Sequence, residues 1–330
     1  MEKMIIVCGP TATGKTALAI SIAKEIRGEL VSADSRQIYR CMNIGTGKDL
    51  ENNKTIMSLQ QTVPYGNKTY ILAPYDFQDT PLWMYDVVNP DEPFSVALYQ
   101  HLVRHVIGSI LGRGNIPVVV GGTGLYIRSI IKPFETAEIK PDMDLREAAK
   151  DIPVHALQDM VKSESCEVWD AMNISDRANP RRLIRKLEII RSTHLLQPSD
   201  FKKTDNMIIG LTAPNALLYE RIDARVEKRM EEGLLDEIAG LLHQGYDWRF
   251  PSFDALGYRQ WRLWFEDKNK QSDDNKKMII EKWKHEEHAY ARRQMTWFKK
   301  DKSIRWFDVS RSSSCDDAKG AALTWYNTRI

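Results

Sequence analysis

One short stretch near the N-terminus limits what this chain can fold into more than any other. Residues 9–16 have the sequence Gly-Pro-Thr-Ala-Thr-Gly-Lys-Thr, which fits the pattern G-x-x-x-x-G-K-[ST]. The apolar run before it, at residues 4–8, suits a buried parallel strand, and the apolar residues after it recur with helical spacing. Strand, glycine-rich loop and helix therefore follow one another in the order that a phosphate-binding loop requires.

This pattern is suited to holding phosphate groups. Its glycines let backbone N–H groups wrap a phosphate, and the first turn of the following helix adds positive potential. Lys15 supplies a mobile positive charge, and Thr16 is placed to bind Mg²⁺. The alternative is a glycine-rich turn that only starts a helix, and the flanking strand and helix argue against it. The predicted phosphate-binding residues are Gly9, Thr11, Ala12, Thr13, Gly14, Lys15 and Thr16.

The composition is that of a globular protein large enough for one α/β domain and a smaller one, with 330 residues of which 42% are hydrophobic. The four cysteines form no C-x-x-C pair, so neither a zinc site nor a disulfide framework is indicated, as is typical of a reducing cytosol. The N-terminus enters the first strand without a leader, and no apolar run is long enough to span a bilayer. We therefore expect a soluble, cytoplasmic protein without membrane partners.

Charge is unevenly distributed along the chain. The net charge of +2 alone argues against a nucleic-acid partner. Residues 181–203, however, contain seven Lys or Arg against two acids, and residues 276–305 contain ten against four. Arg181, Arg182 and Arg185 could form a solvated helix face or a phosphate-binding face, and we favour the second because the chain also carries a phosphate-binding loop.

Two further polar side chains are expected at the carboxyl ends of strands, where parallel α/β sheets bind ligands. Asp34 follows the apolar run 29–32, and Thr123 lies in the sequence Gly-Gly-Thr-Gly after the clear central strand 116–120. Asp34 could instead cap a helix, and the glycines beside Thr123 could serve a structural turn. The phosphate-binding loop, expected at the same sheet edge, favours the functional interpretation of Asp34.

The rest of the chain predicts an interrupted core. Residues 50–82 are polar and indicate a surface insertion, followed by the third strand at 85–88. A helical period with prolines between 133 and 204 indicates a helical insertion domain within a core formed by 1–132 and 205–330. A long helix is expected from about 274 to 300, where cations and aromatic residues mix as they do on RNA-contacting surfaces.

A small-molecule kinase is the main alternative function, because arginines of a helical insertion could close over ATP. Against it, no apolar strand ends in the acid that a Walker-B magnesium site needs: Asp86 precedes Val87 and Val88, and Val120 runs into Gly121. A GTPase would need an Asn-Lys-x-Asp base reader, which the sequence lacks.

Several blocks of this sequence, in order, resemble one family, the tRNA dimethylallyltransferases, also called tRNA isopentenyltransferases. The resemblance extends from Met4 to about Phe307, nearly the whole chain. The phosphate-binding loop alone is not specific to this family, whereas the ordered set is. The blocks are residues 9–16, 34–39, 44–48, 121–126, 179–183, 221–225, 257–260 and 293–298.

The resemblance implies a reaction and a fold. Members of the family transfer a five-carbon prenyl group from dimethylallyl diphosphate to the exocyclic N6 amine of the adenosine immediately 3′ of the tRNA anticodon, and release diphosphate. The implied fold is an α/β, P-loop NTPase-like parallel sheet flanked by helices, with an inserted α-helical domain that grips the anticodon stem-loop. The loop at residues 9–16 would hold the isoprenoid diphosphate with Mg²⁺ bound at Thr16, and we expect a monomer.

The resemblance also implies roles for single residues. Asp34 is predicted as the general base for the poorly nucleophilic adenine amine, and Thr123 and Arg225 as groups that stabilise the departing diphosphate. The implied tRNA-binding residues are Asp34, Ser35, Arg36, Gln37, Arg146, Arg181, Arg182, Leu183, Arg185, Gly257, Tyr258, Arg259, Gln260, Arg293 and Gln294.

The sequence departs from the family pattern at two places. The insertion at 50–82 exceeds what many bacterial members have, so its role is open. The C-terminal zinc finger of some eukaryotic members is missing, which fits the bacterial type. A related branch prenylates free adenine nucleotides, and the two basic clusters favour tRNA as the acceptor instead.

Overall fold

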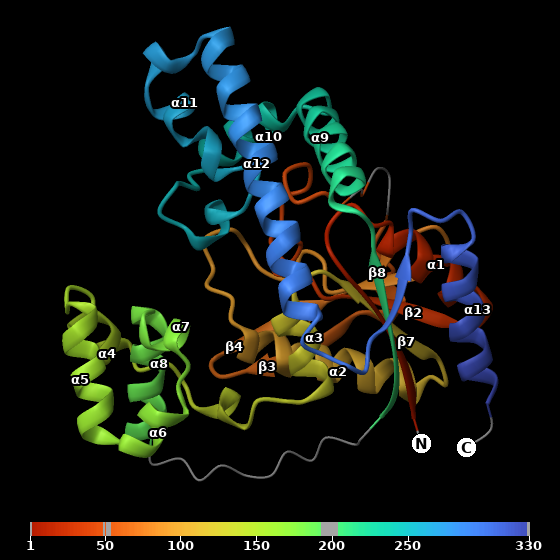
Figure 1. The fold of residues 1–330 in the computed structure, drawn as a ribbon, viewed down its shortest axis with the longest axis horizontal. Helices are drawn as coiled ribbons and strands as arrows, with labels where there is room; N and C mark the ends of the chain where they lie inside the picture. The colour runs from red at the N-terminus through yellow and green to blue at the C-terminus, as the bar shows by residue number, and fades with distance from the viewer. Residues whose placement is uncertain (1, 49, 51–53, 193–203, 329–330) are drawn as a thin grey trace. The chain divides into compact units, whose positions relative to one another are not determined.

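A seven-stranded, almost entirely parallel sheet forms the centre of the larger part of the chain (Figure 1). The computed structural model describes residues 2–48, 50, 54–192 and 204–328. The strands lie in the order β5-β6-β2-β7-β1-β8-β9, and each neighbouring pair is parallel except β5 with β6. Their bounds are β1 (Lys3–Cys8), β2 (Gly28–Ser32), β5 (Tyr75–Asp76), β6 (Pro81–Trp83), β7 (Ile116–Gly121), β8 (Asp205–Thr212) and β9 (Arg305–Asp308). The predicted α/β class with a P-loop-like parallel sheet is confirmed.

Helices cover both faces of this sheet, as strands that are apolar on both faces require. On one face, Val7 and Val120 pack with α1 (Lys15–Glu25) and α13 (Ser314–Asn327), which lie side by side (Figure 1). On the other face, Ile6 and Val119 pack with residues of α2 (Val96–Gly112) and α3 (Gly124–Ile131). The Ser95 hydroxyl accepts the Leu98 N–H at 3.1 Å and so caps the N-terminus of α2.

Three longer helices of the larger unit lie between β8 and β9. α9 (Asn215–Glu231) begins shortly after β8 and packs against α12 (Asp273–Phe298), and α10 (Leu234–His243) lies between them in sequence. The bounds of α12 confirm the long helix expected from the sequence. The short helices here are η1 (Met57–Leu59), η3 (Pro251–Asp254), η4 (Arg259–Trp261), α11 (Arg262–Glu266) and η5 (Lys268–Lys270).

The chain divides into two compact units, one of Met1–Lys132 with Lys202–Ile330 and one of Pro133–Phe201. The smaller unit is helical and has its own apolar core, in which Leu157, Leu183 and Leu187 are fully buried. Residues 193–203, the end of the predicted helical insertion, lie outside the described residues. The elements of the smaller unit are η2 (Glu135–Glu138), α4 (Met143–Ala148), α5 (Val154–Glu164), α6 (Cys166–Ala171), α7 (Ile174–Arg177) and α8 (Pro180–Arg191).

Residues 61–83 form a hairpin and two short strands of the main sheet. β3 (Gln61–Tyr65) and β4 (Lys68–Leu72) form an antiparallel hairpin, after which β5 and β6 join the edge of the main sheet. The strand expected at residues 85–88 is wrong, because β6 ends at Trp83. Met84 and Asp86 have φ angles of 69° and 52°, a left-handed backbone that interrupts a regular strand.

Among the described residues, no helix is both long enough and apolar enough to cross a lipid bilayer.

Candidate active site

The predicted phosphate-binding loop joins β1 to α1. Gly9 has a φ of 137°, and a Cβ there would lie 2.3 Å from the Leu211 carbonyl oxygen, so only glycine fits. Gly14 adopts the left-handed conformation just before Lys15 begins α1. Thr13 is buried, and its hydroxyl donates to the Pro10 carbonyl at 2.9 Å, so this side chain stabilises the loop from within. The loop geometry that the sequence predicts is therefore present.

The ammonium group of Lys15 lies over the loop, where it can bind an anion. Its ammonium group donates to the Pro10 carbonyl oxygen at 2.6 Å. Burial, together with the positive charge of Arg225, lowers the pKa of Lys15 to about 8. A bound polyphosphate would bring more negative charge to this amine and would favour its protonated form.

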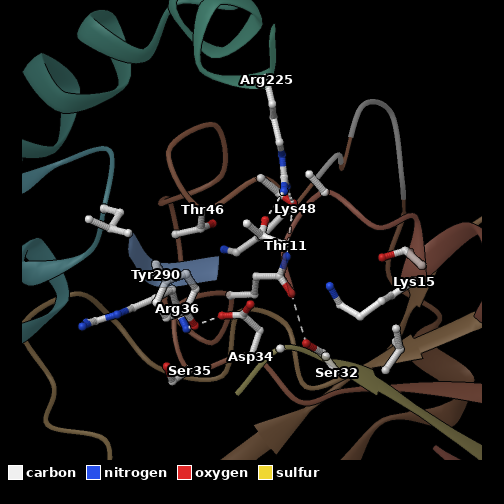
Figure 2. Close-up of a pocket in the computed structure, with 18 of the residues that line it drawn as sticks. Thr11, Lys15, Ser32, Asp34, Ser35, Arg36, Thr46, Lys48, Arg225 and Tyr290 are labelled. Carbon is white, nitrogen blue, oxygen red and sulfur yellow. Dashed lines mark hydrogen bonds between the residues drawn. The ribbon is translucent and has the colours of Figure 1, made fainter. Parts of the chain in front are cut away.

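A cavity of about 580 Å³ opens at the carboxyl ends of β1, β2 and β7. Many of the residues singled out from the sequence line it, while Gly9, Thr13 and Thr123 lie outside its lining. Figure 2 shows Asp34 between Lys15 on one side and Arg36 and Tyr290 on the other. The predicted residues that line the cavity are Thr11, Ala12, Gly14, Lys15, Thr16, Asp34, Ser35, Arg36, Gln37, Arg225, Arg259, Arg293 and Gln294.

Asp34 combines a structural contact with a free oxygen. Its Oδ1 accepts the backbone N–H of Arg36 at 2.9 Å, a local turn contact and not a helix cap, because no helix begins among the described residues directly after Asp34. Its Oδ2 has no hydrogen-bond donor among the residues that the structure describes. The carboxylate is half-buried at the edge of the cavity, so one oxygen holds the turn and the other can accept a proton.

Arg225 connects the phosphate-binding loop to the loop at residues 43–48. From α9, its guanidinium donates to the Thr11 hydroxyl at 3.1 Å and to the Gly47 carbonyl at 3.3 Å. Gln37 donates to the same Gly47 carbonyl at 3.1 Å and accepts from the Ser32 hydroxyl. A Cβ on Gly47 would lie 2.1 Å from the Arg225 guanidinium, so a side chain there would displace this cation. This packing aims a cation at the space in front of Lys15.

The loop at 43–48 is itself fixed by a carboxylate. Glu237, on the first turn of α10, accepts backbone N–H groups of Asn43 and Ile44 at 2.8 Å and of Gly45 at 3.2 Å. The Tyr258 hydroxyl donates to the same carboxylate at 2.6 Å. The sequence analysis missed Glu237, because only the fold brings it to a loop almost two hundred residues away.

Gln294 lies inside the protein, between the two glycine-rich loops. Its amide oxygen accepts the Thr11 N–H at 2.9 Å, and its amide nitrogen donates to the Gly122 carbonyl at 2.9 Å. A Cβ on Gly122 would lie 2.2 Å from this amide, and one on Gly124 would lie 2.0 Å from the Trp297 ring. The glycines around Thr123 therefore permit close approach of α12.

Thr123 reaches the region of Asp34 indirectly. Its hydroxyl accepts the Ser35 N–H at 3.1 Å and hydrogen-bonds the phenol of Tyr290. Tyr290 lines the cavity, and burial together with the negative charge of Asp34 raises the pKa of the phenol, so its hydroxyl stays neutral. The sequence analysis saw Tyr290 only as one aromatic residue of a long helix.

The block at residues 257–260 is mostly core. Tyr258 is fully buried, with its hydroxyl on Glu237, and Gln260 accepts the Gly257 N–H at 2.9 Å. Gly257 has a φ of 94°. Arg259 differs, because its side chain is exposed at the cavity and is paired with Glu286. The structure thus brings only Arg259 of this block to a surface from which it could contact RNA.

In the smaller unit, two predicted arginines are engaged internally. Arg146 and Arg185 both bind the buried Glu188, at 2.6 and 2.8 Å, and Arg185 also donates to the Thr136 and Ile139 carbonyls. Glu188 loses solvation on burial, but these two arginines outweigh that cost and lower the pKa of its carboxyl.

The other residues of this cluster have different surroundings. Leu183 is fully buried in the core of the unit, and Arg182 is paired with Asp176. Arg181 is exposed and has no ion pair with any residue that the structure describes. The cluster that looked uniform in the sequence therefore separates into internal cations and surface cations.

The donor atoms suited to a metal ion are few. No group of three or more His, Cys, Asp or Glu side chains in the described part of the chain is arranged to hold one. Thr16, at the start of α1 and lining the cavity, offers a hydroxyl beside the place where a phosphate would lie. Such a donor set suits a hard cation that takes most of its ligands from phosphate and water.

Sequence comparison connects this site with known enzymes. A profile of the family described as IPP transferase matches residues 69–301, and one described as isopentenyl transferase matches residues 2–61. The chain is 37% identical over 311 residues to a tRNA dimethylallyltransferase of Roseiflexus castenholzii, covering 91% of this chain and 90% of the relative. It is 35% identical over 322 residues to one of Bacillus cereus, covering 94% and 90%.

Solved structures agree. A tRNA isopentenylpyrophosphate transferase from Bacillus halodurans matches with a TM-score of 0.66 at 32% identity, covering 98% of this chain and 96% of that chain. A eukaryotic dimethylallyltransferase, described as acting on tRNA, shares the fold with a TM-score of 0.75 at 20% identity, covering 100% and 81%. With relatives this similar along most of both chains, and with a phosphate-binding loop beside a cavity-lining carboxylate, the chain belongs to the tRNA dimethylallyltransferase family.

Proposed function

We infer that this protein transfers a dimethylallyl group from dimethylallyl diphosphate to the N6 amine of the adenosine immediately 3′ of the anticodon in tRNA. The observation that carries this inference is the placing of Asp34 in one cavity with Lys15, Thr16 and Arg225. A base and an anion-binding site are thereby adjacent, as a displacement of diphosphate by a weak nitrogen nucleophile requires. The acceptor and the donor follow from the family to which the chain belongs.

The reaction makes one bond and breaks one. The N6 nitrogen forms a bond to C1 of the prenyl group, while the bond from C1 to the diphosphate oxygen breaks and diphosphate leaves with the electron pair. We propose that Asp34 accepts the N6 proton on its free Oδ2. Lys15 and Arg225 bind the diphosphate and stabilise the charge that develops on it, and Thr123 holds the Ser35 backbone beside Asp34.

Mg²⁺ fits this site by the chemistry of its donors. We propose that Thr16 and the diphosphate oxygens hold it, because the described residues of the cavity wall include no carboxylate cluster that could bind a metal ion. When bound, Mg²⁺ would neutralise charge on the diphosphate. Asp86 is unsuited to this task, since its carboxylate is occupied by Lys48 and by the Tyr75 hydroxyl.

The anticodon stem-loop is proposed to bind through exposed cations. On α12, Arg292 and Arg293 are both exposed, and Arg293 belongs to the cavity lining. On α8, Arg181 and Arg182 are exposed. We do not extend this role to Arg146, Arg185, Tyr258 or Gln260, since their polar atoms bind other parts of the protein. We further propose that the protein acts as a monomer in the cytoplasm, which is consistent with its four unpaired cysteines.

A direct assay tests this function against its alternatives. The protein is incubated with Mg²⁺, labelled dimethylallyl diphosphate and either unmodified tRNA or AMP, and a third reaction contains ATP alone. Label in tRNA supports the proposal. Label in AMP would instead assign the protein to nucleotide prenylation, and phosphate transfer from ATP without prenylation would make it a kinase.

Removing one phosphate contact should change the salt dependence of tRNA binding. Arg181→Ala should reduce the slope of log K against log salt by roughly one, because one fewer counterion is released. The measurement is the affinity for an anticodon stem-loop between low and moderate salt. Arg249→Ala is the matched control, since Arg249 is also exposed but is paired with Asp247 outside both basic clusters. Equal slopes for Arg181→Ala and the unmodified protein would exclude the contact.

Diphosphate binding should depend on pH through Lys15. Below pH 8 the amine is already protonated and affinity should be flat, whereas above pH 8 binding must add a proton, so affinity should fall by up to about tenfold per pH unit. Calorimetry with inorganic diphosphate from about pH 6.5 to about pH 9.5, a range that spans the lowered pKa, measures this. The guanidinium of Lys15→Arg stays charged over this range, so the pH profile of diphosphate binding to this variant should lack the fall due to Lys15. Ionisation of the diphosphate itself affects both proteins alike. Identical profiles would contradict the assignment.

A further inference from the structure

The cavity has an apolar wall to which the proposed chemistry assigns no role. Phe77, Leu82, Tyr85 and Val120 line it, and all four residues are at most 8% exposed. They belong to one core cluster on the α1 face of the sheet. Leu82 lies on β6 and Val120 near the end of β7, while Phe77 follows β5 directly. Phe77 and Leu82 therefore come from the segment 50–82, whose role the sequence left open, and Tyr85 follows it closely.

Hydrogen bonds hold the backbone at Phe77 in a tight turn. Its N–H donates to the Thr80 carbonyl at 2.9 Å, and the Thr80 N–H donates back to the Phe77 carbonyl at 3.2 Å. The two residues between them, Gln78 and Asp79, have φ angles of 54° and 61°, as in the two-residue turns that join antiparallel strands tightly. Leu82 pairs in register with Leu30 of β2. This part of the wall is thus tied to the central sheet.

Tyr85 is fixed from both sides. Its neighbours Met84 and Asp86 both have left-handed backbones, which turn the chain sharply at this point. The Asp86 carboxylate accepts the Tyr75 hydroxyl at 2.5 Å and forms an ion pair with the buried Lys48. Lys48 also donates to the Tyr39 carbonyl at 2.5 Å. Polar contacts therefore hold the chain next to Tyr85 in place.

We propose that these four residues bind the apolar end of the prenyl chain and limit its length to five carbons. The proposal rests on the proposed function, which places the diphosphate at Lys15 and Thr16. Lys15 begins α1, and the apolar lining on the α1 face of the sheet is this wall, whereas Asp34 and Arg36 in the same lining are polar. A ten-carbon chain would have to displace close-packed side chains whose backbone is fixed, and such overpacking is unfavourable. The segment from β5 to Tyr85 would thus serve as the length gauge of the donor site.

Enlarging the wall should change donor preference. Phe77→Ala and Leu82→Ala are assayed with unmodified tRNA and either dimethylallyl or geranyl diphosphate, and the mass of the modified adenosine identifies the product. The ratio of kcat/KM for the ten-carbon donor to that for the five-carbon donor should rise at least about tenfold over the unmodified protein. Ile71→Ala, an exposed position on β4, is the control and should leave the ratio unchanged.

The outcomes separate this inference from the function on which it rests. If the unmodified protein prenylates no tRNA with the five-carbon donor, the proposed function fails. If it does, and the folded variants keep the original donor ratio, the length gauge is refuted. Because Phe77→Ala opens a cavity in the core, thermal melting is measured for each variant. Phe77→Leu, which shortens the side chain but keeps it apolar, replaces Phe77→Ala if the latter does not fold, and a rise in the ratio is again expected.

Discussion

Replacing Asp34 by asparagine should lower the single-turnover rate of prenyl transfer by about 10²- to 10⁴-fold at saturating tRNA. The amide of Asp34→Asn can still accept the Arg36 N–H, so the turn after β2 should survive. It cannot accept the N6 proton, because an amide is not a useful base at neutral pH. Asp34→Ala should be at least as inactive and should also weaken the turn. The measurement is a rapid-quench rate with labelled dimethylallyl diphosphate.

A second carboxylate in the same cavity provides the matched control. Asp254 lines the cavity and is exposed, and the proposed chemistry assigns it no role. Asp254→Asn removes the same charge and should leave the single-turnover rate within a few-fold of the unmodified protein, by the usual size of effects at exposed positions. A rate for Asp34→Asn close to that of Asp254→Asn would exclude Asp34 as the general base.

Replacing Lys15 by alanine should reduce kcat/KM for dimethylallyl diphosphate by about 10²- to 10³-fold while tRNA affinity changes little. The ammonium group lies over the phosphate-binding loop, with Arg225 donating to the Thr11 hydroxyl nearby. Removing it takes away a cation that acts on the leaving group. Steady-state kinetics give the first quantity, and binding of an anticodon stem-loop gives the second.

Lys24→Ala is the control for this variant, because Lys24 lies in the last turn of the same helix and is exposed. It should behave as the unmodified protein in both measurements. An inactive Lys15→Ala whose only defect proved to be weaker tRNA binding would contradict the assignment of Lys15 to the diphosphate.

The sequence by itself determined those features that depend on neighbours along the chain. The phosphate-binding loop, the Ser95 cap of α2 and the Asn179–Pro180 start of α8 are local, because each requires a few residues with particular backbone and hydrogen-bonding properties. The apolar strands also predicted the parallel sheet and placed Asp34 at its active edge, whereas the role of Arg225 was predicted from the family resemblance. The expected strand at 85–88 failed for a local reason that apolar pattern does not reveal, the left-handed turns at Met84 and Asp86.

Only the tertiary structure decided how residues far apart in sequence use their polar groups. Gln294 and Tyr258 belong to motifs that suggested RNA contact, yet Gln294 joins the two glycine-rich loops and Tyr258 binds Glu237 inside the protein. Arg185 looks like Arg181 in the sequence, but the buried Glu188 binds Arg185 and forms no ion pair with Arg181. The physical reason is that a buried polar group must find its partner within hydrogen-bonding distance, and packing of distant elements determines which partner that is.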